Sequence, residues 1–289
     1  MRHAYLQGIK TGLLQWRITA SVYLIQLGLS LTLGIQIYEV LQASIGHSLE
    51  INKLMHGYDH TVLTDFLKVH GASITPLLGQ IRWLLLLWLL FSVFINGGLL
   101  YCAAEPRQAS VRLFWQGGAV YFWPFLKIGL FFLLLALAWT LLIWLPVALV
   151  IQPSLEYFSS EKYTVWLVLI ALIVWLSGLG ILLLWSVLSR LQRLEYGMPI
   201  AKSLAGGWRI FRQNKLRFLI LLALFTGMQV LLVTVYFLIQ SYSGMTSPFL
   251  IVLFFLIQQG FVFFRIQLRQ MLYAAMHVAS FGENPPSAS

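Results

Sequence analysis

The chain has 289 residues, of which 60% are apolar and 10% charged, and its formal net charge is +10. Soluble domains average about 45–50% apolar and about 25% charged residues, so this composition excludes an ordinary soluble domain. In a soluble protein such a positive charge would suggest nucleic acid. Here the basic residues flank apolar stretches, so we expect membrane lipids and their anionic headgroups as partners, and no nucleic acid.

Six apolar stretches follow one another along the chain, and each is long enough to cross about 30 Å of hydrocarbon as a helix. They cover residues 18–40, 83–102, 128–151, 164–188, 218–240 and 248–268. Backbone groups must pair within each span, and the alternation of a barrel strand is absent, so the sequence predicts an all-α polytopic membrane protein with six transmembrane helices. The first stretch is too long for a signal peptide and lacks a clear cleavage site, so we expect it to stay as a span.

The charges of the connecting segments predict the orientation. Fifteen of the 19 Lys and Arg residues lie in the two termini or in the segments after the second and fourth spans. The opposite segments hold the other four, together with six of the nine acidic residues. Positive charge stays on the cytoplasmic side of a membrane. We therefore expect a multi-pass protein of the cell inner membrane with both termini in the cytoplasm.

The external connections differ in length. Residues 152–163 and 241–247 are short, so the spans on either side of each form tight hairpins. Residues 41–82 form one sizeable external segment, whose apolar residues recur at helical spacing. This spacing predicts two short amphipathic helices on the outer membrane face, the second ending at Gly71. Residues 1–280 are expected to form a single transmembrane domain, followed by a disordered tail over 281–289.

The three inner segments share a pattern, in which a glycine begins an aromatic-rich amphipathic stretch that ends in a basic residue just before a span. These stretches cover residues 8–17, 118–127 and 207–217. The pattern predicts three repeats, each an interfacial helix on the cytoplasmic side followed by a two-span hairpin. Chance is the alternative, because any helix at this position favours aromatic and basic residues. The residues expected at the membrane surface are Arg17, Trp123, Lys127, Trp208, Arg209, Arg212, Lys215 and Arg217.

No ionisable residue lies in the middle of a predicted span, which argues against a proton-coupled pump or an ion transporter. The spans do contain amides and glycines, expected to form hydrogen bonds between helices or to let helices approach closely. The alternative is a lining for a cavity at a shared centre. The residues concerned are Asn96, Gly97, Gly98, Gly178, Gly180, Gln229, Gln258 and Gln259.

The external segment holds the one cluster that resembles a catalytic or metal-binding set. His56 and His60 are four residues apart, so a helix would place both on one face, as metal ligands need. Asp59 and His60 are candidates for acid–base catalysis on a lipid headgroup. Polar residues of an interfacial helix are the simpler interpretation, since Gly57 weakens a helix there and no His-Glu-x-x-His pattern is present. No phosphate-binding loop, nucleophile elbow or dinucleotide fingerprint appears, so no cofactor is expected.

Three strings carry a resemblance to a known family. Residues 48–66, residues 94–100 with their Asn96-Gly97-Gly98 sequence, and residues 117–127 resemble uncharacterised bacterial six-span proteins. In plan these are similar to the membrane domain found beside some glycerophosphoryl diester phosphodiesterases. The activity of that family lies in a separate soluble barrel domain with no counterpart in this sequence. The resemblance therefore implies a membrane module and assigns no catalytic residue.

The sequence thus predicts a non-enzymatic integral inner-membrane protein. It would bind or help to move a lipid or another apolar molecule, or act as a scaffold with another membrane protein in an envelope complex. One alternative is a membrane-embedded enzyme that acts on lipid headgroups through Asp59 and His60. The other is a channel or transporter for a small solute.

Overall fold

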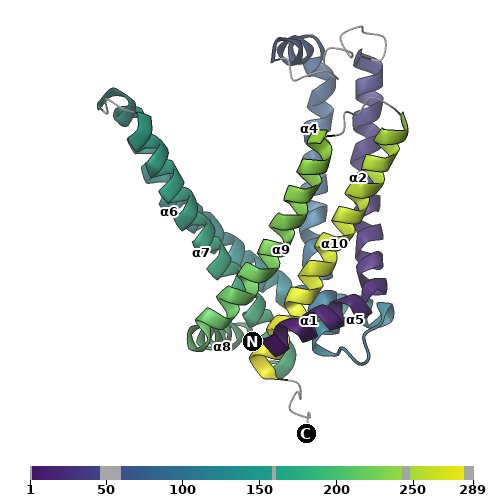
Figure 1. Cartoon of the computed structure of the whole chain (residues 1–289), viewed down its shortest axis with the longest axis vertical. Coiled ribbons are helices and arrows are strands. Elements are labelled where there is room, and N and C mark those ends of the chain that lie inside the picture. Colours follow the sequence, from purple (N-terminus) through teal and green to yellow (C-terminus); the bar gives the residue numbers. More distant parts are fainter. Residues whose placement is uncertain (1, 46–59, 158–160, 243–247, 283–289) are drawn as a thin grey trace. The chain divides into compact units, whose positions relative to one another are not determined.

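The computed structural model describes residues 2–45, 60–157, 161–242 and 248–282, and the regular structure of these residues is entirely helical (Figure 1). The helices are α1 (Arg2–Leu14), α2 (Trp16–Ile45), α4 (His60–Ala104), α5 (Val111–Val120), α6 (Phe122–Tyr157), α7 (Glu161–Tyr196), α8 (Ile200–Gln213), α9 (Lys215–Tyr242) and α10 (Pro248–Phe281).

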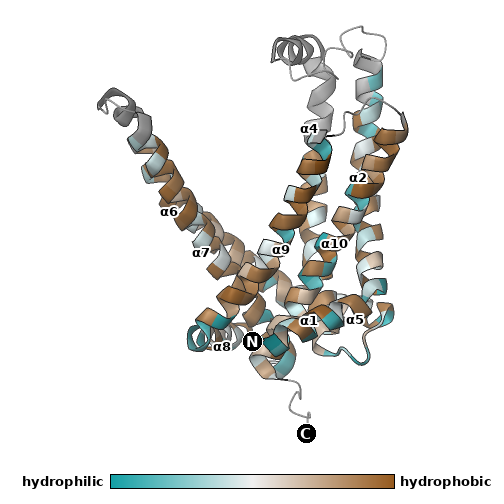
Figure 2. Cartoon of the chain, viewed as in Figure 1, coloured by the Kyte–Doolittle hydropathy of each residue, from teal (hydrophilic) through white to brown (hydrophobic). Residues whose placement is uncertain are grey.

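Six of these helices are long and apolar enough to cross a membrane, which confirms the predicted fold class of a polytopic all-α protein. The candidate spans are Trp16–Glu39 in α2, Gly79–Ala104 in α4, Phe122–Leu149 in α6, Tyr163–Tyr196 in α7, Lys215–Ser241 in α9 and Phe249–Phe281 in α10. Hydrophobic residues predominate along α6, α7, α9 and α10 (Figure 2). The protein is therefore a multi-pass membrane protein.

The helix predicted to end at Gly71 does not end there, because α4 runs unbroken from His60 to Ala104. A glycine ends a helix by adopting a left-handed conformation. Among the described residues only Gly197 and Gly282 have a positive φ, and these follow α7 and α10 directly. Gly71 keeps its place inside the helix at a cost of about 1 kcal/mol relative to alanine. Residues 46–59 and 283–289 lie outside the described residues, and with them most of the predicted first external helix and of the predicted tail.

Two spans are longer than predicted at their C-terminal ends. The sequence placed the ends of the fourth and sixth spans at Leu188 and Leu268, before basic residues. In the structure α7 continues to Tyr196 and α10 to Phe281. The basic residues Arg190 and Arg269 therefore lie inside long helices instead of in connecting segments.

The chain divides into two compact units, Met1–Ala20 with Val93–Ser289, and Ser21–Ser92. The larger unit contains three short helices, α1, α5 and α8, and each leads into a long helix through a single non-helical residue. We use the term base for these three helices together with the ends of the long helices that contact them.

The three breaks between short and long helices share a pattern of burial. The break residues are Gln15, Tyr121 and Asn214. Seven positions before each break the residue is buried, and the same holds four positions after it. The buried residues are Gly8, Phe114 and Gly207 before the breaks, and Thr19, Phe125 and Phe218 after them. The three stretches therefore bury residues at the same positions relative to their breaks.

Each short helix crosses the end of a long helix at very close range: α1 crosses α10, α5 crosses α4 and α8 crosses α7. A Cβ atom on Gly118 would lie 2.6 Å from the ring of Phe94, and one on Gly207 would lie 2.6 Å from Oγ of Ser189. Missing side chains let helices approach in this way. The short helices α5 and α8 thus pack on the long helix that precedes them in the chain. The first helix, α1, packs on the last and closes the ring of contacts.

Candidate functional site

Buried polar side chains gather in the base, where α4 meets α10. Oη of Tyr273 donates a hydrogen bond to Oδ1 of Asn96 over 2.7 Å. Arg269 donates through Nε to Oη of Tyr273 over 3.0 Å, and through a terminal nitrogen to the same Oδ1 of Asn96. Asn96 and Tyr273 are 8% and 6% exposed. One amide oxygen therefore accepts two hydrogen bonds from α10 and fixes the direction of the Arg269 side chain.

A second arginine, Arg190 of α7, reaches the same region. Its guanidinium carbon lies 5.8 Å from the centre of the Phe125 ring of α6. A Cβ atom on Gly129 would lie 3.4 Å from a terminal nitrogen of Arg190, so this glycine leaves room for the side chain. Nε of Arg190 is fully buried and has no hydrogen-bond partner. The same Cβ position on Gly129 lies 4.0 Å from a methyl group of Val93, which precedes Asn96 by one turn of α4.

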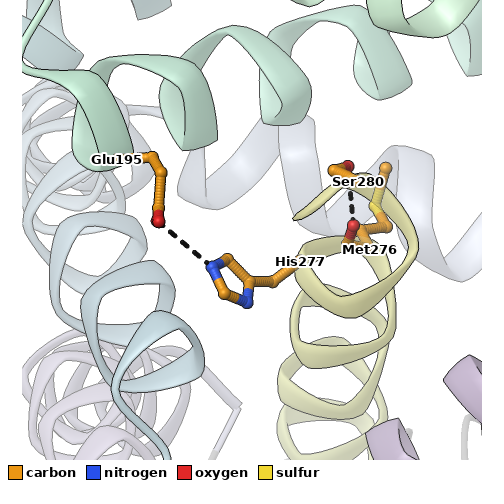
Figure 3. Close-up of polar contacts among 4 residues, drawn as sticks. All are labelled: Glu195, Met276, His277 and Ser280. Carbon is orange, nitrogen blue, oxygen red and sulfur yellow. Dashed lines mark hydrogen bonds and ion pairs between the residues drawn. The ribbon is translucent and has the colours of Figure 1, made fainter. Parts of the chain in front are cut away.

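The acid closest to Arg190 along α7, Glu195, is engaged elsewhere. Its Oε2 lies 3.4 Å from Nε2 of His277 of α10, and both side chains are almost fully buried (Figure 3). The pKa of Tyr121, which lies near Glu195, is raised above its usual value, mainly by burial. Tyr101 and Glu195 raise this pKa further, and Arg193 lowers it. Among the described residues no carboxylate contacts Arg190 or Arg269, so these two positive charges of the base have no acidic partner there.

A network of amides joins α10 to the start of α2 and the end of α4. Oγ1 of Thr19 donates to Oε1 of Gln270 over 3.0 Å, and Nε2 of Gln270 donates to Oε1 of Gln15. Nε2 of Gln15 in turn donates to the backbone oxygen of Cys102 over 3.2 Å. All of these groups are buried, and each amide finds a partner, so this network holds the base together.

The amides and glycines that the sequence singled out lie either in the base or along the long helices away from it. Asn96, Gly97 and Gly98 lie in the base, where a Cβ atom on Gly98 would come within 2.4 Å of the Phe114 ring of α5. Gly178 lies in the α6–α7 hairpin, where a Cβ atom would come within 2.3 Å of the Trp139 ring. The absence of a side chain at these positions leaves room for the close approach of these rings.

Two other members of that set, Gly180 and Gln258, contact the adjacent helix α9. A Cβ atom on Gly180 would lie 3.5 Å from a methyl group of Leu222 in α9. Gln258 donates to Oη of Tyr236 over 2.6 Å, which links α10 to α9. Gln229 is half-buried, and Gln259 is half-buried with an interaction of its own. The hydrogen bonds and glycine contacts of this set do not bring Gly178, Gln258 and Asn96 together.

Most of the residues predicted at the membrane surface are exposed. They are Arg17, Trp123, Lys127, Trp208, Arg209, Arg212 and Lys215. The exception is Arg217 in the first turn of α9, which is half-buried and whose Nε has no hydrogen-bond partner.

The external cluster precedes and begins α4 in the sequence. His56 and Asp59 lie outside the described residues, and His60 is the first residue of α4, with a side chain that also lies outside them. Within the described part of the chain, no group of three or more His, Cys, Asp or Glu residues is placed to hold a metal ion. Cys102 is fully buried at the end of α4, with its sulfur 4.0 Å from the backbone oxygen of Ser110.

Sequence reasoning treated Arg190 and Arg269 as ordinary basic residues flanking a span. A signal for their partial burial was present, because the apolar pattern continues past each of them. Leu191 follows Arg190, and Met271 and Tyr273 follow Arg269, and all three are buried. An arginine inside a continuing apolar helix indicates a cation held partly out of water, which function usually has to justify.

Comparisons of this chain with protein-family models, with curated proteins and with solved structures find no match. The described residues define the class: an integral membrane protein whose six long apolar helices end in a base with half-buried arginines.

Proposed function

We propose that this protein is a non-enzymatic membrane protein that binds anionic lipid at its base. The observation that carries the proposal is the two-sided character of α8. This helix buries Gly207 and Phe211 against the base and exposes Lys202, Arg209 and Arg212. A helix of this kind lies in the plane of the membrane interface, with its basic face toward the headgroups.

The exposed tryptophans of the base support the same placement. Trp16 is 54% exposed, Trp123 is 67% exposed and Trp208 is 41% exposed. Each lies in a short helix or within the first two residues of a long one. Tryptophan is enriched at the level of the headgroups, where one end of its ring system is apolar and the other is wet. Basic residues among such tryptophans each contribute roughly 1 kcal/mol toward binding of an anionic surface.

In this proposal the base and both termini lie on the cytoplasmic side of a bacterial inner membrane. The support is the positive charge, since 15 of the 19 Lys and Arg residues belong to the termini and to the segments around the short helices.

The three units of one short helix and two long helices are, in this proposal, copies of one repeat. The shared positions of the breaks support it, as do the close crossings at Gly8, Gly118 and Gly207. A ring of like contacts between successive units is how repeats bury surfaces that none of them can bury alone.

The test compares the thermal stability of the protein in nanodiscs of phosphatidylcholine alone and with about one third phosphatidylglycerol. The expected result is a higher Tm with the anionic lipid, and a reduced gain after Arg209→Gln, because the variant removes one cation that is exposed on α8.

Arg82→Gln is the matched control, because Arg82 is also exposed but lies near the opposite end of its span. An equal Tm of the unaltered protein in the two lipid mixtures would overturn the proposal. Equal losses of the gain in Arg209→Gln and Arg82→Gln would do the same, because the effect would then not belong to the base.

A further inference from the structure

We propose that Arg190 and Arg269 form a binding site for a phosphate group in the base, with Asn96 and Tyr273 as the residues that position Arg269. The phosphate is a monoester headgroup of a lipid or free inorganic phosphate, which share their chemistry. This inference deepens the proposed function by naming the chemistry of one bound group, and it rests on different residues from those of the α8 surface.

The first argument is charge. Arg190 and Val93 both border Gly129, and Val93 lies one turn of α4 before Asn96, which accepts a hydrogen bond from Arg269. No described carboxylate contacts either arginine. Buried charges in proteins are paired or bound to an ion, because an unpaired charge away from water is strongly unfavourable. Two neighbouring guanidinium groups call for about two negative charges. A phosphate monoester carries about −1.5 to −2 at pH 7 and matches this requirement better than a single carboxylate.

The second argument is hydrogen bonding. Arg269 uses two of its N–H groups on Asn96 and Tyr273, which leaves its other donors free. Arg190 contacts the face of Phe125, and its buried Nε has no acceptor. Each guanidinium thus retains donors in the planar arrangement that binds two oxygens of one phosphate. A buried donor without an acceptor in an otherwise satisfied network indicates a missing partner.

The third argument is how firmly the arginines are held. Asn96 of α4 fixes Arg269 by a hydrogen bond. The Arg190 side chain packs on α6, where it contacts the Phe125 ring and fits beside Gly129. Arg190 as a whole is half-buried, as is Arg269, so the pair is not sealed from the surroundings. A site held in place before binding loses little conformational entropy when the ligand arrives.

The deciding variant is Asn96→Asp. It replaces the amide by a carboxylate of nearly the same shape, at an atom that already accepts hydrogen bonds from Arg269 and Tyr273. The new carboxylate would supply inside the protein the negative charge that phosphate supplies from outside. We therefore expect Asn96→Asp to be more stable than the unaltered protein in phosphate-free buffer, and to gain much less from phosphate.

The measurement is the Tm of the delipidated full-length protein in a maltoside detergent at pH 7, followed by tryptophan fluorescence. Inorganic phosphate is titrated against sodium chloride of equal ionic strength. A concentration about 100-fold above Kd should raise the Tm of the unaltered protein by roughly 5–10 °C, and chloride should not. Calorimetric titration should give one phosphate per chain.

Arg190→Gln is the second variant, with Arg209→Gln on the exposed face of α8 as its matched control. Arg190→Gln removes one of the two unpaired charges. It should leave the Tm in phosphate-free buffer unchanged or raised and abolish the shift with phosphate. Arg209→Gln should keep the full shift, which separates this site from general attraction of anions to a basic surface.

Dihexanoylphosphatidic acid and dihexanoylglycerol distinguish the two sources of phosphate. A shift with the phosphatidic acid at concentrations at least tenfold below those of inorganic phosphate identifies a lipid headgroup, and comparable concentrations identify a site for free phosphate. Either result supports the site, provided that dihexanoylglycerol has no effect.

The inference is overturned if neither phosphate compound shifts the Tm beyond chloride. An undiminished shift in both Asn96→Asp and Arg190→Gln would overturn it as well. A loss of the lipid effect in the α8 variant with an intact phosphate shift would count against the proposed function alone, so the two proposals can fail separately.

Discussion

Gly8 in the first helix lies directly against Ala275 near the end of the last helix, and a Cβ atom on Gly8 would come within 2.6 Å of Cβ of Ala275. The same Cβ atom would lie 2.7 Å from the backbone oxygen of Met271, so the obstacle includes backbone that cannot turn aside. This contact joins the two ends of the chain and completes the ring in which every short helix crosses the end of a long one.

Gly8→Ala should therefore destabilise the base. Overpacking of a close contact costs about 1–3 kcal/mol, because the two helices must move apart. Gly227→Ala in α9 is the matched control, since nothing lies within 4 Å of a Cβ atom there, and alanine is the better helix former. Thermal unfolding in detergent measures both. Equal Tm values for the two variants would contradict the close crossing of α1 and α10.

Asn96→Leu should lower stability by about 1–3 kcal/mol, because it leaves buried donors of Arg269 and Tyr273 without their shared acceptor. Gln229→Leu should change stability by less than about 0.5 kcal/mol, since Gln229 is only half-buried. Chemical unfolding of the two variants side by side provides the comparison. A larger loss for Gln229→Leu would mean that the amides in the spans matter more than the polar cluster of the base.

The pair of Glu195 and His277 should show energetic coupling between α7 and α10. The two side chains lie 3.4 Å apart, with 9% and 5% of their surfaces exposed. A double-mutant cycle of Glu195→Gln and His277→Ala should give an interaction energy of about 0.5–3 kcal/mol. Additive effects within about 0.3 kcal/mol would show that the contact contributes nothing specific to the joining of these helices.

Single cysteines should report which side of the membrane the base faces. In a Cys102→Ser background, Gln108→Cys lies in the exposed connection between α4 and α5, and Ser241→Cys lies exposed near the end of α9. A membrane-impermeant maleimide should label Ser241→Cys in intact spheroplasts, and Gln108→Cys only after permeabilisation. The reverse pattern would place the base outside and contradict the positive-inside argument.

The spans were predictable from the sequence because crossing hydrocarbon imposes a local requirement, about 20 apolar residues in a row, which any window of sequence displays. Gly71 shows the limit of local signals. A glycine can end a helix or lie within one, and the choice depends on whether the chain must turn there. In α4 it need not turn, so the helix continues.

The candidate site was harder to predict because its members are far apart in the sequence. Asn96 was identified as a polar residue in a span, but its partners Arg269 and Tyr273 lie on another helix more than 170 residues later. Arg190 resembles any basic residue at the end of a span until Phe125 and Gly129 are seen around it. These contacts depend on how the helices of the base pack on one another, and no local sequence pattern shows that packing.

The most direct test of the central claim, that the base binds an anionic headgroup, is an experimental structure of the full chain in nanodiscs that contain phosphatidic acid. We predict phosphate density about 2.7–2.9 Å from the guanidinium nitrogens of both Arg190 and Arg269, the usual length of a charge-assisted hydrogen bond. A structure in which a protein carboxylate occupies that position, or in which both guanidinium groups are solvated without any bound anion, would contradict the account.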